Sequence, residues 1–187
     1  MLIQILTHQP QMLTQIAKGT PVWVWGLLVA LLALGISQLA DRTPSLRRVV
    51  LVPVAMLGLA LYGMVSAFSN GPLLAPIALV WAASASAATG LMLQLRTPAG
   101  TRFDADTASF WVPGSSVPLL LILGIFMTKY IVGIELTLNP AQARDASFVL
   151  PVGLLYGAFN GIFIARAVRL LRLARRSTAP RNTTLAV

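Results

Sequence analysis

The sequence contains no cysteine and only one histidine, His8, among its 187 residues. Without cysteine the chain can form no disulfide, no thiolate metal site and no cysteine nucleophile. One histidine cannot by itself build a histidine-rich metal site or a histidine-based catalytic triad. We therefore expect no metal site, no cofactor and no enzymatic reaction.

Charge is also scarce, because charged residues make up 10% of the chain and hydrophobic residues make up 57%. Soluble domains have about 25% charged and about 45–50% apolar residues, so a soluble protein is excluded. A transmembrane helix needs about 20 apolar residues, within a range of roughly 17–25. Five segments meet this length: residues 21–39, 49–68, 72–93, 117–134 and 148–165.

The predicted fold is therefore all-α, a bundle of five transmembrane helices within residues 21–176. Residues 1–20 are expected to form an amphipathic segment on the membrane surface, and residues 177–187 a polar tail. In the long loop after the third span, the short runs TRFD and SFWV favour a small hairpin. Asp104 and Asp106 in this loop are interpreted as turn residues rather than metal ligands, because no third ligand is visible nearby.

The N-terminal segment contains an imperfect repeat, MLIQILTHQP and MLTQIAKGTP, offset by eleven residues. Eleven residues are close to three helical turns, so both copies would present similar faces if they were helical, although Pro10 favours a break. An alternative interpretation is that Met12 is the true start. The two interpretations stay open.

The basic residues predict the orientation, because cytoplasmic loops of membrane proteins carry the excess of Lys and Arg. With the C-terminus inside, the cytoplasmic segments contain 11 of the 14 basic residues. These are Arg42, Arg47, Arg48, Arg96, Arg102, Arg166, Arg169, Arg172, Arg175, Arg176 and Arg181. The net charge of +9 is thus mostly a consequence of topology. We expect a multi-pass protein of the bacterial inner membrane with its N-terminus outside.

Four sequence elements carry a family resemblance, in the order TPVWVW, PGSSVPL, TKYIVG and YGAFNGIFIAR. Together they resemble an uncharacterised family of small bacterial polytopic inner-membrane proteins, over residues 12–176. The first eleven residues depart from that family's pattern. The resemblance implies the fold and the bacterial setting, and it brings no reaction, ligand or catalytic residue.

Lys129 is a charged residue inside the fourth predicted span. A lysine at the centre of a span costs about 2.5–3.5 kcal/mol on insertion scales, so such residues usually face protein or water and often mark function. Lys129 lies five residues before Ile134, roughly 8 Å inside the outer end of the span. Its side chain either reaches the outer surface or turns inward, where Tyr62, Trp81 and Tyr156 lie at a comparable depth.

Only the inward alternative keeps a binding site possible. The candidate polar site in the membrane consists of Lys129, Tyr62, Tyr156 and Asn160. Asn160 is placed near mid-membrane, where a polar amide more often joins helices than binds a substrate.

Two surfaces of small residues predict helix packing. Gly153, Gly157 and Gly161 form two successive GxxxG units on the fifth span, and Ala82, Ser86 and Gly90 form a small face on the third. We expect these faces to pack against each other within one bundle. Contact between two copies of the chain is the alternative.

The C-terminal run ARAVRLLRLARR places basic residues on a helix that continues from the membrane: Arg166, Arg169, Arg172, Arg175 and Arg176. We expect these residues to contact anionic phospholipids of the inner leaflet, where each charge contributes about 1 kcal/mol. Nucleic acid is not an expected partner.

The sequence thus predicts a non-enzymatic membrane protein that acts through assembly or contact with a partner, which includes another membrane protein or a second copy. The alternative is a small oligomeric transporter or channel module for an anionic or polar solute, with Lys129 at its site. The absence of an inverted repeat or a pair of interrupted helices weakens this alternative.

Overall fold

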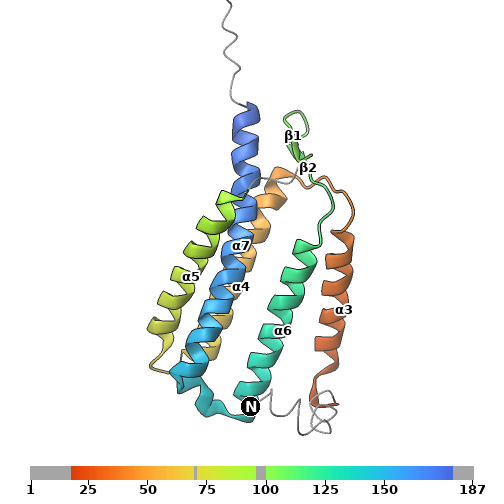
Figure 1. Cartoon of the computed structure of the whole chain (residues 1–187). Coiled ribbons are helices and arrows are strands. Elements are labelled where there is room, and N and C mark those ends of the chain that lie inside the picture. Colours follow the sequence, from red (N-terminus) through yellow and green to blue (C-terminus); the bar gives the residue numbers. More distant parts are fainter. Residues whose placement is uncertain (1–17, 70, 96–99, 179–187) are drawn as a thin grey trace, which may run out of the picture.

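The computed structural model describes residues 18–69, 71–95 and 100–178, and within them the chain forms five α-helices and one short hairpin (Figure 1). With the labels of Figure 1, the α-helices are α3 (Val22–Ser37), α4 (Leu46–Phe68), α5 (Leu74–Gln94), α6 (Val117–Leu138) and α7 (Ala146–Thr178). The strands are β1 (Arg102–Asp104) and β2 (Ser109–Trp111), and a 3₁₀ helix, η1 (Pro140–Arg144), joins α6 to α7. The predicted N-terminal amphipathic segment and the polar tail lie almost entirely outside the described residues.

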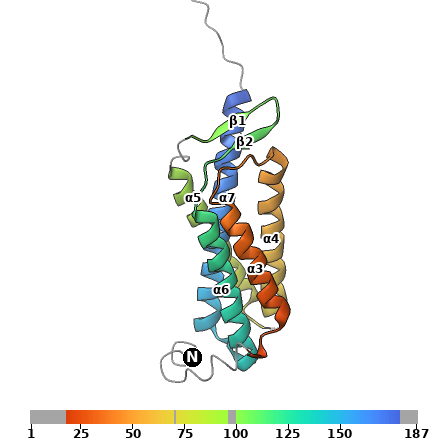
Figure 2. The ribbon, with the colours of Figure 1, turned by 90° about the vertical axis from the view of Figure 1, so that its right-hand side faces the viewer.

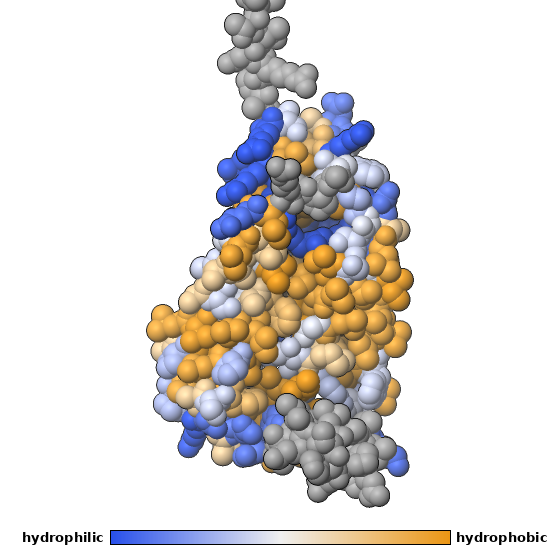
Figure 3. Space-filling model, viewed as in Figure 1, coloured by the Kyte–Doolittle hydropathy of each residue, from blue (hydrophilic) through white to orange (hydrophobic). Residues whose placement is uncertain are grey.

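Four of the helices, α4 to α7, are long and apolar enough to cross a membrane. The fifth, α3, has 16 residues and is therefore about 24 Å long, short of the roughly 30 Å of a hydrocarbon core. It begins after Pro21 and ends where the backbone N–H groups of Gln38 and Leu39 donate to the carbonyls of Gly35 and Ile36. Figure 3 shows a mostly apolar surface over the middle of the molecule, with hydrophilic residues gathered toward its two ends.

The helices form two groups that meet along α7 (Figures 1 and 2). In the first group α5 packs along α7 more extensively than any other pair of elements, and α4 also packs on α7. In the second group α3 packs on α6, and α6 has a smaller contact with α7. The buried core of the first group includes Met64, Phe68, Ile77 and Val149. Helix α7 is thus the common support of the bundle.

Three glycines of α7 allow the close approach of α5. A methyl group added to Gly153 would lie 3.2 Å from the carbonyl oxygen of Ile77, and one added to Gly157 would lie 2.8 Å from Ser84 Cβ. A methyl group on Gly161 would lie 2.7 Å from Ala88 Cβ. The missing side chains therefore let the two backbones touch, as in other small-residue helix contacts in membranes.

Two hydroxyl groups join the same pair of helices. Ser84 Oγ donates to the carbonyl of Leu154 at 2.7 Å. Thr89 Oγ1 lies 2.7 Å from the carbonyl of Ala85 and 3.1 Å from that of Gly161, so it bridges α5 and α7. Hydrogen bonds between helices in an apolar setting fix the rotation of one helix against the other.

The predicted α5 face was wrong, because Ala82, Ser86 and Gly90 are exposed. The face that meets α7 contains Ile77 and Ala85, both buried, and lies about 100° around the helix, one residue earlier. Since residues 82–90, AASASAATG, are all small, their size does not select one face. The bulky Ile77 and the hydroxyls of Ser84 and Thr89 select it instead. Contact between two copies through the exposed face remains a prediction.

The hairpin closes one end of the bundle, which we call the hairpin end. Strands β1 and β2 are antiparallel with Phe103 opposite Phe110, and the chain between α3 and α4 extends the pairing through Arg42 and Val112. Phe110 is fully buried in a cluster with Val49, Val112 and Ala174. The hairpin is therefore anchored to the first turn of α4 and to the far end of α7.

The carboxylate of Asp104 stabilises the turn of the hairpin, in which Asp106 lies. Asp104 accepts hydrogen bonds from Thr107 Oγ1 at 2.6 Å and from the backbone N–H of Asp106 at 3.1 Å. These bonds hold the pKa of the Asp104 carboxyl below its usual value. Across the described ranges, no three His, Cys, Asp or Glu side chains come together as they would to hold a metal ion.

The α5–α7 contact yields a prediction about stability. We expect Gly157→Ala to lower the free energy of unfolding by about 1–3 kcal/mol, because the added methyl group would overlap Ser84 and the Trp81 carbonyl. Denaturant unfolding in detergent, followed by circular dichroism, measures the change. Gly90→Ala is the matched control, because nothing lies within 4 Å of the methyl group there. It should be neutral or stabilising by up to about 1 kcal/mol, since glycine is a poor helix former. Equal effects of the two substitutions would contradict the proposed contact.

Candidate functional site

Lys129 turns inward, toward α4 and α7. Its Nζ lies 5.0 Å from the centroid of the Tyr156 ring on α7. On the α4 side, Nζ lies beside Gly63. A methyl group added to Gly63 would lie only 2.8 Å from Nζ. The ammonium group of Lys129 on α6 therefore reaches both α4 and α7. The absence of a side chain at Gly63 provides the space for it.

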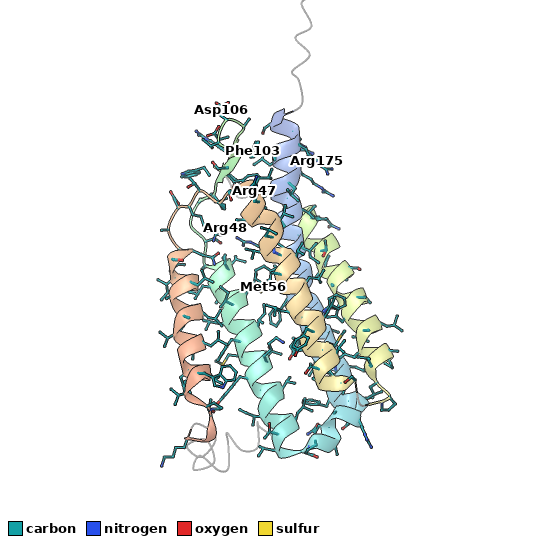
Figure 4. All side chains as sticks on the ribbon, turned by 180° about the vertical axis from the view of Figure 1, so that it is seen from behind. Arg47, Arg48, Met56, Phe103, Asp106 and Arg175 are labelled. Atoms are coloured by element: carbon teal, nitrogen blue, oxygen red, sulfur yellow. The ribbon has the colours of Figure 1, made fainter. Side chains whose placement is uncertain are left out.

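Around Lys129 the three helices form a groove with a volume of about 130 Å³. Its apolar walls include Met56 and Leu59 of α4, Ile125 of α6, and Phe159 and Phe163 of α7. Figure 4 shows Met56 near the middle of α4, away from the hairpin end. Lys129 itself remains exposed, so the groove is open on one side. The site is an open, mostly apolar groove, and Lys129 is the one charged residue among those that line it.

The ammonium group has little to balance its charge. None of the residues that the structure describes forms an ion pair with Lys129, and Tyr156 supplies a cation–π contact. Such a contact contributes about 0.5–2 kcal/mol, less than the roughly 2.5–3.5 kcal/mol cost of a lysine at mid-span. Glu135, on the same helix, is buried and accepts a hydrogen bond from Gln142 Nε2 at 3.4 Å. The cation therefore has room for an additional polar or anionic group.

The structure brings together three of the four residues predicted for the site. Tyr156 and Asn160 are buried, lie one turn apart on α7, and line the groove with Lys129. Asn160 Nδ2 donates to the carbonyl of Tyr156 at 2.8 Å, so this amide is held by its own helix. The aromatic ring and the amide thus form the α7 side of the site.

Tyr62 is not part of the site, because its side chain is 73% exposed. It lies directly before Gly63, and one residue corresponds to about 100° of rotation around a helix, which turns Tyr62 away when Gly63 faces Lys129. Trp81, the other aromatic at this depth, packs against the core cluster that contains Ile77 and Tyr156 instead. The residue of α4 that contacts Lys129 is Gly63, which was not predicted from the sequence. The only sequence signal for this contact is that Gly63 is small and lies at a depth similar to that of Lys129.

A neighbouring face of α6 brings together two of the sequence elements that carry the family resemblance. Tyr130, next to Lys129, forms a 2.7 Å hydrogen bond between its hydroxyl and Thr20 Oγ1. Its ring also lies 6.5 Å from that of Trp25 and is stacked on Phe126 at 6.1 Å. The elements TPVWVW and TKYIVG therefore meet in the α3–α6 contact. Their aromatic residues fix α6 on one side while Lys129 reaches out on the other.

The predicted lipid-contact arginines lie on the last four turns of α7, near the hairpin end. Arg172, Arg175 and Arg176 are exposed, whereas Arg166 and Arg169 are partly buried. Arg169 Nη1 lies 3.5 Å from the carbonyl of Leu95, at the end of α5. A second hollow of about 350 Å³ lies there, between Leu93–Leu95 and the arginines at 169, 172 and 176. Arg169, Arg172 and Arg176 thus lie beside the end of α5.

No curated protein and no solved structure matches the chain. One family does, and its match covers residues 1–181, including the first eleven residues that the sequence resemblance had left outside the pattern. The resemblance to an uncharacterised family is therefore confirmed, with that correction at its N-terminal end. The chain belongs to DUF6622, a family of unknown function.

Proposed function

We propose that this chain is a five-span protein of the bacterial inner membrane that acts by binding a partner, without catalysis. The helix α3 completes the five spans by tilting less than its longer neighbours or by local thinning of the bilayer, at a cost of fractions of a kcal/mol per Å. The N-terminus is outside, and the hairpin end with its arginines is in the cytoplasm. Figure 4 shows Arg47, Arg48 and Arg175 together at that end, with Phe103 of the hairpin.

The observation that carries the binding proposal is the position of Lys129. Its ammonium group lies in an open apolar groove, against Gly63 and Tyr156, with no ion pair from the described part of the chain. A charge that is kept at lipid depth without a counter-ion lowers stability and is typical of a functional site. The partner supplies the missing acidic or polar group.

The size of the groove favours a side chain of a partner helix over a free solute. Sites for small molecules usually enclose about 300–1,000 Å³, whereas this groove has about 130 Å³ and is open along one side. A carboxylate or amide from a neighbouring transmembrane helix would fit beside Lys129, with the apolar walls receiving the rest of that helix. Transport of an anionic solute through the same groove is the second candidate, and Lys129 is the observation in its favour.

The orientation can be tested with reporters in bacterial cells. We expect a fluorescent protein at the C-terminus to fluoresce and alkaline phosphatase at the same place to be inactive, because the C-terminal arginines stay in the cytoplasm. Fusions truncated after Ser69, in the connection between α4 and α5, should give the opposite pattern. Phosphatase activity at the C-terminus would refute the proposed topology.

If Lys129 serves binding rather than folding, its presence should lower the free energy of unfolding. We expect Lys129→Met to raise the free energy of unfolding in detergent by about 1 kcal/mol. The free-energy cost of placing the lysine charge in an apolar setting exceeds the stabilisation from its cation–π contact. Lys18→Met is the control, because Lys18 is exposed outside the spans, and should change stability by less than about 0.5 kcal/mol. A clear loss of stability in Lys129→Met would instead show that this lysine holds the three helices together.

The binding itself can be tested by purifying the full chain from bacterial membranes in mild detergent. We expect a membrane protein to co-purify with the wild type and with Lys18→Met, to fall at least about tenfold with Lys129→Met, and to return in part with Lys129→Arg, which keeps the charge. A partner retained equally by all four chains would reject Lys129 as its site. Uptake of an anionic solute by vesicles containing the wild type, and not Lys129→Met, would replace the partner proposal with the transport candidate.

A further inference from the structure

A second cationic site lies at the hairpin end, where the chain between α3 and α4 passes α7. The backbone of Arg42 pairs with Val112 in both directions, at 3.0 Å and 2.9 Å, so an isolated bridge fixes this part of the chain beside the hairpin. Val112 and Phe110 pack in turn against Ala174, with Ala167 and Leu170 beside them. The pairing therefore holds Arg42 against the part of α7 that carries Arg166 and Arg169.

The side chain of Arg42 is only partly satisfied by protein groups. Its Nη1 donates to Gln38 Oε1, four residues before it in the chain. Its Nε is buried and has no hydrogen-bond partner among the described residues. A buried donor without a partner costs about 1–3 kcal/mol, so this nitrogen marks a place where a ligand acceptor would stabilise the fold.

Arg166 adds a second charge of the same sign. It lies one residue beyond the predicted span and close enough to Arg42 and Arg169 for electrostatic repulsion. Burial lowers the pKa of Arg42. The nearby carboxylate of Asp41 accepts the backbone N–H of Gly114 at 2.9 Å and forms no ion pair with either arginine. Arg42 and Arg166 thus lie close together, and among the described residues neither forms an ion pair.

We infer that Arg42 and Arg166, with Arg169 at the edge, form a binding site for a phosphate group, and that the phosphate is the headgroup of an anionic phospholipid. Guanidinium groups bind phosphate oxygens through paired charged hydrogen bonds, and a phosphate would satisfy the Arg42 Nε while separating the like charges. In the proposed orientation the site is level with the headgroups of the inner leaflet. The site differs from the exposed Arg172, Arg175 and Arg176, which provide only a general attraction to an anionic surface.

The experiment uses the full-length protein in nanodiscs and compares Arg42→Gln and Arg166→Gln with Arg175→Gln, which removes an exposed charge from the same end. Lipid binding is measured by native mass spectrometry with phosphatidylglycerol, and thermal stability is measured in phosphatidylglycerol and in phosphatidylcholine. We expect the affinity for phosphatidylglycerol to fall about 10- to 100-fold in Arg42→Gln and in Arg166→Gln. In Arg175→Gln it should fall at most about fivefold.

Stability provides an independent readout that separates binding from folding. The wild type should gain stability in phosphatidylglycerol relative to phosphatidylcholine, and Arg166→Gln should lose most of that gain. In phosphatidylcholine, Arg166→Gln should be at least as stable as the wild type, because a repulsive charge is gone. Arg166→Lys keeps the charge without the planar fork and should show an intermediate loss of lipid affinity.

Inorganic phosphate in phosphatidylcholine nanodiscs tests the source of the phosphate. If it alone stabilises the wild type in a manner that needs Arg42 and Arg166, and phosphatidylglycerol does not, the site binds soluble phosphate and the lipid assignment fails. If all three glutamine variants lose lipid affinity equally, the arginines act only as a diffuse basic surface and the site is refuted. These measurements do not depend on Lys129, so they stand or fall separately from the partner proposal.

Discussion

The close contact between α5 and α7 is the constraint on which the rest of the bundle depends. It is made largely of backbone surface, because Gly153, Gly157 and Gly161 present no side chains and the residues that face the last two include the small Ser84, Ala85 and Ala88 of α5. In a membrane, moving an apolar side chain from lipid to a helix interface changes its free energy little. Close packing and a few hydrogen bonds therefore supply most of the free energy of helix association. Once α5 is fixed by Ser84 and Thr89, the other side of α7 is left for α4 and for Lys129 of α6.

Much of this architecture could be predicted from hydropathy alone. The ranges 49–68, 72–93, 117–134 and 148–165 each fall within or almost within one long helix, because a run of about 20 apolar residues has few other options. The limits were less accurate: α6 continues to Leu138, and α4 begins at Leu46, since polar residues extend a helix into the interface without changing its apolar centre. The shortness of α3 was not predicted, because the predicted span continued to the apolar Leu39, whereas the helix ends at Ser37.

The site was harder to predict than the fold. Its depth could be counted from the ends of the spans, and this identified Lys129, Tyr156 and Asn160. The sequence does not show which face of each helix points into the bundle. An error of one residue in that face places Tyr62 where Gly63 lies, or Ala82 where Trp81 lies. Apolar residues surround the whole circumference of α3, α5 and α6, so hydropathy does not indicate which face of these helices is buried. The direction of each side chain depends on contacts that form only in the assembled bundle.

Helix α7 runs without interruption from the groove to the arginines. Tyr156 and Arg166 are ten residues apart, about 15 Å along one axis, and no proline or glycine pair breaks the helix after Gly161. An α-helix is stiff over such a length. A displacement of α7 beside Lys129 would therefore be transmitted along the helix axis to the guanidinium groups at the hairpin end, and a phosphate bound there would limit the same movement from the other end.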